Sequence, residues 1–282
     1  MMLQKLVDSS EDLASLPDVC VRLNAGIDDP HFAAMDLAEI LLLDTALSTV
    51  LLKIVNSAFY NFSMPVETIS RAITVVGIDD LRSLILAASA VGAFKNIASD
   101  LVDMNDFWTH SLYTAVSARC LAKHYSILHP ERLFVMGLLH DVGHLIMYHQ
   151  MPKESSDVLM RTEGEPDLLS DVEKDVFGYT HAQVGAALLK KWRLPDSIVD
   201  GVEDHHNAKA AGDVSLESNI VYIANQMTEV LEHGEPLESL MAKLDFEEMA
   251  APEISEKNMQ MLIQSIPALF TESKSIITPM AI

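Results

Sequence analysis

The chain has 282 residues, of which 41 are acidic and 19 basic, so its formal net charge at pH 7 is −22. A surface this acidic repels phosphate backbones, which argues against electrostatic binding to nucleic acid or to an anionic membrane. Hydrophobic residues make up 49% of the chain and alternating strand-like runs are scarce, so we predict an all-α protein with a large buried core.

Cysteine usage and apolar runs indicate the compartment. Cys20 and Cys120 lie in apolar helical stretches, and two buried thiols without a disulfide fit a reducing environment. The segment from Met1 to Asp12 lacks the apolar core of a signal peptide, and no apolar run is long enough to cross a bilayer. We therefore expect a soluble, cytoplasmic protein.

Residues 9–95 read as a series of short helices. The apolar spacing predicts helices over residues 19–27, 37–41, 47–55, 69–76 and 78–91. The one histidine of this part, His31, lies in a turn beside Pro30. We assign no chemistry to this part of the chain and interpret its leucines as core.

A polar pair inside an apolar stretch organises the rest of the chain. Residues 134–148 are apolar at nearly every other position and contain no proline, which predicts one buried helix. His140 and Asp141 are adjacent in it, and His144 follows one turn later. Buried imidazole and carboxylate groups need compensation, which either a metal ion or a His–Asp hydrogen bond supplies.

Histidines occur in two further predicted helices that face the same core. A helix capped by Asn105 or Asp106 contains His110. Later, Thr180 and the glutamine three residues on have the capping-box form, which places His181 in the first helical turn. That side of the helix is otherwise apolar, so both imidazoles are expected to point inward.

Two segments flank the second of these helices. Pro152 is expected to end the central helix and to be followed by an acidic linker from Glu154 to Asp171. Asp196 caps a helix that leads to the doublet His205-His206.

Together these positions form a candidate metal site built from several helices, which is how helical bundles arrange their ligands. The predicted ligands are His110, His140, Asp141, His181, His205 and His206. The ligand types suit one or two divalent ions of iron, manganese, zinc or nickel without choosing among them. The alternative is a buried hydrogen-bond network without metal. The remaining histidines near helix ends are assigned to solvent: His124, His129, His149 and His233.

The C-terminal part is predicted to be helical as well. A helix over about 217–231 carries Asn225 on an apolar segment, and residues 235–282 read as two or three more helices. We divide the chain into a helical lobe at 10–97, a histidine-rich helical lobe at 98–208 and a C-terminal packing extension at 209–282.

The first two parts resemble the HDOD family, whose name means HD-related output domain. The residues that carry the resemblance are Leu16-Pro17, Leu37-Ala38, Asp44-Thr45-Ala46-Leu47-Ser48, Leu51-Leu52, Asn56-Ser57-Ala58-Phe59-Tyr60, Ile69, Ala72-Ile73, Val76-Gly77 and Leu81. Thr45 departs from the family, which usually has proline there. With the lobe at 98–208, which on this resemblance is an HD-like lobe, the match covers roughly residues 12–208.

The histidine set also resembles the ligand pattern of the HD superfamily, and in part that of the HD-GYP phosphodiesterases, which cleave cyclic dinucleotides at a site with two or three metals. His140-Asp141 matches the HD pair, His110 the first lone histidine, and His181 with the His205-His206 doublet the additional HD-GYP ligands.

Three departures from the HD-GYP pattern weaken the expectation of catalysis. His144 stands where that family has lysine, Asn225 stands where it has aspartate, and residues 207–212 replace its Gly-Tyr-Pro loop. An asparagine removes an anionic ligand, and a histidine is mostly neutral near pH 7. We expect His144 and Asn225 beside the ligands or in contact with phosphate, and we expect metal binding without efficient turnover.

The resemblance implies a bacterial signal-transduction module that acts through contacts with other signalling proteins and catalyses weakly or not at all. The alternative is a metal-dependent phosphohydrolase that cleaves a nucleotide or cyclic dinucleotide. A third reading is a structural bundle with a buried polar network.

Overall fold

The computed structural model describes residues 2–10, 18–27, 31–57, 60, 62, 64–94, 100–163, 165–207, 215–247, 249 and 251–281. These residues form α-helices, turns and short connections, and no β-strand occurs within the ranges just given. The all-α prediction is therefore confirmed.

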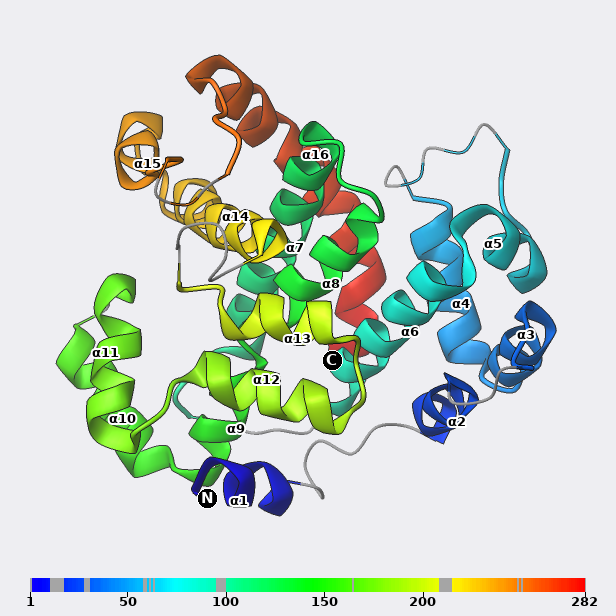
Figure 1. The fold of residues 1–282 in the computed structure, drawn as a ribbon, viewed down its shortest axis with the longest axis horizontal. Coiled ribbons are helices and arrows are strands. Elements are labelled where there is room, and N and C mark those ends of the chain that lie inside the picture. The colour runs from blue at the N-terminus through cyan, green and yellow to red at the C-terminus, as the bar shows by residue number, and fades with distance from the viewer. Residues whose placement is uncertain are drawn as a thin grey trace.

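The first part of the chain forms a group of short helices. They are α1 (Met2–Ser9), α2 (Asp18–Ile27), α3 (Ala34–Leu42), α4 (Thr45–Val55), α5 (Ile69–Val76) and α6 (Ile78–Ala93). Helices α2 to α6 pack on one another, whereas α1 packs on α9 and α12 of the second part (Figure 1). The sequence gives no sign of this contact, because α1 is too short to reveal its partner.

The second part surrounds a buried helix, α8. Its helices are α7 (Met104–His124), α8 (Pro130–Leu139), α9 (Val142–Gln150), α10 (Pro152–Thr162), α11 (Pro166–Phe177), α12 (His181–Lys191), α13 (Asp196–Glu203) and α14 (Leu216–His233). Helix α8 packs on α6, α7, α13 and α14, while α12 packs on α9 and α13. This arrangement brings the ends of α8, α12 and α13 near one another (Figure 1).

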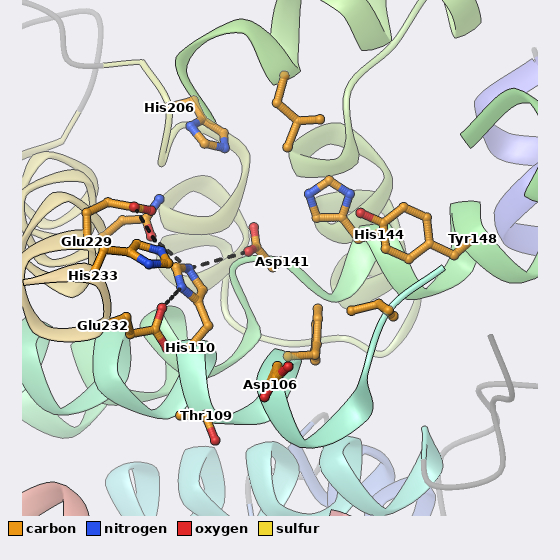
Figure 2. Close-up of a pocket in the computed structure, with 14 residues that line it drawn as sticks. Asp106, Thr109, His110, Asp141, His144, Tyr148, His206, Glu229, Glu232 and His233 are labelled. Atoms are coloured by element: carbon orange, nitrogen blue, oxygen red, sulfur yellow. Dashed lines mark hydrogen bonds and ion pairs between the residues drawn. The ribbon is translucent and has the colours of Figure 1, made fainter. Parts of the chain in front are cut away.

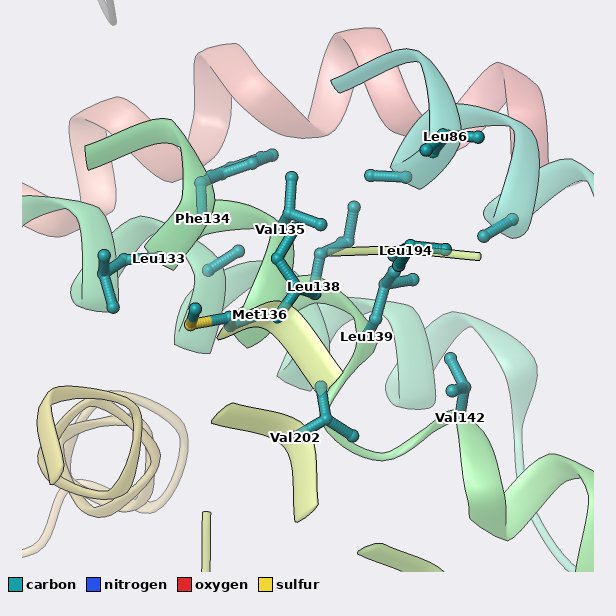
Figure 3. Packing of buried hydrophobic residues seen from close by; sticks show 14 of the residues in the cluster. Leu86, Leu133, Phe134, Val135, Met136, Leu138, Leu139, Val142, Leu194 and Val202 are labelled. Carbon is teal, nitrogen blue, oxygen red and sulfur yellow. The ribbon is translucent and has the colours of Figure 1, made fainter. Parts of the chain in front are cut away.

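The core around α8 explains why a helix apolar on all sides is stable here. Leu133, Val135 and Met136 are fully buried and point in different directions from the helix axis (Figure 3). A Cβ atom on Gly137 would lie 2.7 Å from the Cα atom of Ala115 on α7. The glycine therefore lets the backbones of α7 and α8 come into direct contact.

The prediction of a single central helix over 134–148 was wrong. Helix α8 ends at Leu139 and α9 begins at Val142, with the HD pair in the turn between them. Asp141 has φ −101° and ψ 4°, outside the α-helical range, so the chain changes direction there. At this break the carboxylate of Asp141 faces histidines from other helices.

Two other expectations about local structure also need correction. The acidic stretch 154–171, predicted as a linker, lies largely within α10 and α11, and each of these helices has proline in its first turn. Asp103 caps α7, rather than the predicted Asn105 or Asp106, and accepts hydrogen bonds from the backbone N–H groups of those two residues.

The C-terminal part adds α15 (Leu237–Lys243) and α16 (Glu256–Ala281), in agreement with the two or three helices predicted there. Helix α16 packs on α7 of the second part and on α4 and α6 of the first. The rings of Tyr113 on α7 and Phe270 on α16 stack with centroids 3.7 Å apart. Over the described residues, none of the helices has both the length and the apolar character needed to cross a membrane.

Candidate metal centre

The turn between α8 and α9 aims the HD pair. The Nδ1–H group of His140 donates a 2.8 Å hydrogen bond to the carbonyl oxygen of Gly137. Because a carbonyl oxygen only accepts, this bond places a proton on Nδ1 and turns Nε2 of His140 toward Asp141. That Nε2 is buried, has no hydrogen-bond partner, and lies 3.1 Å from Oδ2 of Asp141.

Asp141 lies between two groups of histidines. Its Oδ2 faces Nε2 of His140 at 3.1 Å and Nε2 of His110 at 3.8 Å. Its Oδ1 faces Nε2 of His181 at 3.4 Å and Nε2 of His205 at 3.5 Å. One carboxylate thus serves two possible ion positions, each through a different oxygen.

The first group consists of Asp141, His181, His205 and His206. Nε2 of His181 lies 2.9 Å from Nε2 of His206 and 3.3 Å from Nε2 of His205. Ligands bound about 2.1 Å from one ion lie about 3.0–3.4 Å apart, depending on whether the geometry is octahedral or tetrahedral. The ligand atoms of this group already have nearly this spacing.

The second group consists of His110, His140 and Asp141. Here the histidine of α7 is held by helix α14. Nδ1 of His110 lies 2.9 Å from a carboxylate oxygen of Glu232, and its Nε2 lies 3.0 Å from Oδ1 of Asn225. The structure therefore brings Asn225 into the site as a partner of His110.

The histidines of the first group are oriented by bonds from their outer nitrogens. Nδ1 of His205 donates to the carbonyl oxygen of Val202 at 2.6 Å. Nδ1 of His181 lies 2.7 Å from Glu173, which also accepts a 2.9 Å bond from the His181 backbone N–H. Such bonds fix the ring orientation and leave Nε2 facing inward, which is the usual arrangement around metal-binding histidines.

Glu173 is a site residue that the sequence interpretation missed. It lies on α11 and its side chain is almost completely buried. A signal for it exists, because Glu173 and Phe177 are one helical turn apart on the buried side of α11. Because the preceding stretch was predicted to be a linker, no helix was expected there and this spacing carried no structural meaning. Glu232, the partner of His110, was missed because it lies beyond the residues that resemble the family.

We expect Glu173→Gln to weaken the affinity of the first group for a divalent ion by about 10- to 100-fold, because a carboxylate that orients a ligating histidine contributes on this scale. Competition titration of Zn²⁺ against a chromophoric chelator measures the change. Asp171→Asn, which removes the same charge from an exposed position of α11, should leave the affinity unchanged. Equal affinities in the two variants would contradict the role given to Glu173.

The electrostatics of the cluster favour a bound cation. Burial alone would raise the pKa of Asp141, but the imidazoles of His140, His181 and His205 hold that pKa well below its usual value. Burial lowers the pKa of His205 to about 4 and lowers the pKa of His206 as well, so both rings are neutral near pH 7. Ionised carboxylate and neutral imidazole are the forms that bind metal.

The stabilisation of positive charge by the cluster is clearest at His181. Burial lowers its pKa, but the carboxylates of Glu173 and Asp141 outweigh burial and raise the pKa to about 10. Positive charge is therefore stabilised at this point of the cluster. The buried Nε2 of His140, which lies 3.1 Å from a carboxylate oxygen of Asp141, marks a second point of the cluster where positive charge is favourable. The residues present thus fit a divalent ion.

His144 lies beside the ligands. Its ring stacks on that of His181 with centroids 3.7 Å apart, and on that of Tyr148 at 5.2 Å. Nδ1 of His144 lies 3.4 Å from Glu173. Burial lowers the pKa of His144 to about 4, so the ring is neutral near pH 7. It packs the cluster from the side of α9.

A cavity of about 510 Å³ opens beside the cluster. Figure 2 shows Asp141, His110, His144 and His206 bordering it from segments far apart in the chain, including α7, the start of α9 and the turn after α13. The described residues that line it include no lysine or arginine, whereas carboxylates are present from the following residues: Asp106, Asp141, Glu229 and Glu232. Burial lowers the pKa of His110, but Glu232 and Asp141 outweigh burial and raise that pKa to about 9, so its imidazole is the main cationic group on the described wall near pH 7.

The histidines assigned to solvent have exposed positions, although two of them have partners. His129 is 57% exposed and its Nδ1 lies 2.9 Å from buried Asp80. His233 is 66% exposed, borders the cavity and lies 3.5 Å from Glu229. Most of the segment that replaces the Gly-Tyr-Pro loop, residues 208–212, lies outside the described residues.

Comparison with known proteins places the chain in a family. The HDOD domain matches residues 13–208. An uncharacterized protein of Treponema pallidum (strain Nichols) is 27% identical over 247 residues, which cover 85% of this chain and 46% of that protein. The chain therefore spans less than half the length of this relative.

Solved structures share the fold. A crystal structure from Shewanella amazonensis SB2B, whose name proposes a phosphohydrolase, has a TM-score of 0.77 at 24% identity and covers 96% of this chain and 97% of its own. An HDOD domain protein of unknown function from Geobacter sulfurreducens has a TM-score of 0.69 at 23% identity and covers 98% of both chains. With the family match extending over most of its length, the chain belongs to the HDOD family.

Proposed function

We propose that this protein is a regulatory signalling module of the HDOD family that binds a divalent metal ion through its HD-like lobe. The observation that carries the proposal is the shared position of Asp141, whose two oxygens face histidines from α7, α12 and the end of α13. Iron, manganese, zinc and nickel suit this ligand set. Its partners are other signalling proteins, as in the family resemblance.

A regulatory role is favoured over efficient catalysis by the side of the cluster that faces α14. Asn225, a neutral residue, stands beside His110, and the described cavity wall contains no lysine or arginine. A phosphodiester with several negative charges would meet the carboxylates of Glu229 and Glu232 there, and the one strongly basic imidazole, His110, is already paired with Glu232. These features fit a site that binds an ion for a regulatory purpose and does not hydrolyse a phosphodiester efficiently.

A second candidate is a metal-dependent phosphohydrolase. It is favoured by the cavity of about 510 Å³, which gives a small ligand access to Asp141 and His206. The name of the Shewanella protein proposes phosphohydrolase activity for that protein. A divalent ion bound here would supply Lewis acidity toward a phosphoryl oxygen and would lower the pKa of water.

Elemental analysis of the full chain, purified without chelator, tests metal binding. We expect at least one ion per chain in the wild type and in His124→Ala, a change at the far end of α7. Removal of the ion with chelator should lower the melting temperature by roughly 5–10 °C, because ligand at 100 times its Kd stabilises by about 2.7 kcal/mol. A metal-free protein after reconstitution under anaerobic conditions with Fe²⁺, Mn²⁺ and Zn²⁺ would refute both candidates.

Activity then separates the two candidates. The metal-loaded protein is incubated with a model phosphodiester, bis-p-nitrophenyl phosphate, and with a cyclic dinucleotide. We expect no hydrolysis above that of the Asp141→Asn variant. Sustained turnover at many cycles per minute, lost in that variant, would establish the phosphohydrolase in place of the regulatory module.

A further inference from the structure

The two groups that share Asp141 are not equally prepared for an ion. In the first group, His181 lies 2.9–3.4 Å from ligand atoms of His206, His205 and Asp141, and His205 lies 3.5 Å from Asp141. In the second group, Nε2 of His110 lies 3.8 Å from Asp141. Adjacent ligands of one ion are expected about 3.0–3.4 Å apart, so the four contacts of the first group come closer to this spacing than the contact between His110 and Asp141.

Both ring nitrogens of His110 are already engaged. Glu232 is a carboxylate at 2.9 Å from Nδ1, so this nitrogen carries the proton of that hydrogen bond. The side-chain amide of Asn225 forms a hydrogen bond with Nε2 of His110, with Oδ1 at 3.0 Å. Whichever way its amide group is turned, either Nε2–H donates to the amide oxygen or the amide nitrogen donates to the Nε2 lone pair. In both arrangements the lone pair that an ion would need is not free.

The partners of His110 come from one helix whose register is fixed against α7. The hydroxyl groups of Thr114 on α7 and Thr228 on α14 are fully buried and lie 3.0 Å apart. Thr114 is one turn from His110, and Thr228 lies between Asn225 and Glu232 on the same side of α14. Packing therefore sets Asn225 and Glu232 opposite His110 at the same time.

From these contacts we infer that the protein binds a single divalent ion, at Asp141, His181, His205 and His206, and that helix α14 prevents a second ion by holding His110. The inference rests on the proposed metal site and specifies its occupancy. Helix α14 lies outside the matched residues 13–208, so a segment beyond the family domain controls the site. A movement of α14 away from α7 would release His110 and open the second position.

Single occupancy also has a chemical consequence. Two ions about 3.5–4 Å apart can clamp both the attacking and the leaving oxygen of a phosphoryl group, and one ion cannot. The contact between α14 and His110 thus keeps the site in a form that binds an ion but lacks the second ion of a two-metal hydrolase. This is the property expected of a regulatory module.

The test is the zinc content of the full chain. Protein stripped with chelator is equilibrated with Zn²⁺ buffered at low free concentration, and bound zinc is measured by elemental analysis. We expect one zinc per chain in the wild type. Asn225→Asp removes the amide that contacts Nε2 of His110 and adds an anionic ligand, so we expect two zinc ions per chain in this variant. Asn225→Ala frees the nitrogen without adding charge, and its second zinc should appear at a higher free concentration than in Asn225→Asp.

Two further variants make the result specific. In the double variant Asn225→Asp with His110→Ala, the content should return to one zinc, because the second ion needs His110. Glu229→Gln changes the charge of the same cavity wall without touching a nitrogen of His110, and it should stay at one.

The outcomes distinguish this inference from the proposed function. Two zinc ions in the wild type, or one in both Asn225 variants, would overturn the inference and leave the metal site standing. No zinc in any of these proteins would overturn the metal site, and the inference with it. A second zinc in Asn225→Asp that survives the loss of His110 would also count against the inference, because it would place that ion elsewhere.

Discussion

Replacing Asp141 by asparagine is expected to lower the affinity for a divalent ion by more than about 100-fold, beyond the range seen when only an orienting partner is lost. Within the described residues, Asp141 is the one anionic member of both histidine groups. Its two oxygens face imidazole nitrogens from four histidines at 3.1–3.8 Å. The amide keeps the shape of the side chain but loses the charge and one of the acceptor oxygens.

Calorimetric titration with Zn²⁺ measures the affinity, and melting curves with and without chelator give an independent readout. The variant should melt at the same temperature in both conditions, whereas the wild type should not. Asp157→Asn is the matched control, because Asp157 on α10 is 56% exposed and lies away from the cluster. If Asp141→Asn kept the wild-type affinity, Asp141 would not be a ligand and the shared-carboxylate arrangement would be wrong.

Gly143→Ala is expected to destabilise the protein by about 3 kcal/mol, which is at the upper end of the range for an overpacked core. The same change is expected to impair metal binding. A Cβ atom at position 143 would overlap the carbonyl oxygen of His181 and lie 2.7 Å from the backbone nitrogen of Gly185. Both atoms belong to the backbone of α12, so no side chain can rotate to make room. The start of α9 must move away from α12, and Asp141 would then separate from His181.

Urea denaturation measures the stability of this variant, and zinc titration measures its site. Gly92→Ala is the control, since a Cβ at Gly92 on α6 meets no atom within 4 Å. Alanine there should stabilise the helix by about 0.5–1 kcal/mol through its better helical propensity. Wild-type stability in Gly143→Ala would mean that α9 and α12 are less closely packed than described.

Much of the architecture could be predicted because its signals are local. The capping box at Thr180 and Gln183 is present as expected, with hydrogen bonds in both directions, and it starts α12 at His181. Polar residues on apolar helix faces also indicated which side chains share the interior. His140, His181 and His205 are completely buried and within reach of one carboxylate, as that reasoning required.

Other features depend on contacts between distant segments and leave little trace in the sequence. The break between α8 and α9 lies beside the close packing of Gly143 against α12, whereas the apolar periodicity of the sequence continues through it. The partners Glu173 and Glu232 are single acidic residues among many in a chain with a net charge of −22. Their roles appear only when α11 and α14 are placed beside the histidines.

Helix α16 has a mechanical consequence. It lies against α4 and α6 on one side of the molecule and against α7 on the other, and Phe270 stacks on Tyr113 of α7 (Figure 1). Tyr113 is three residues from His110, so any sliding of the first group of helices past the second must shear α16 or carry α7 along with it. Helix α16 thus couples the two groups of helices, so a displacement of α4 and α6 is transmitted through Phe270 and Tyr113 to the part of α7 that carries His110.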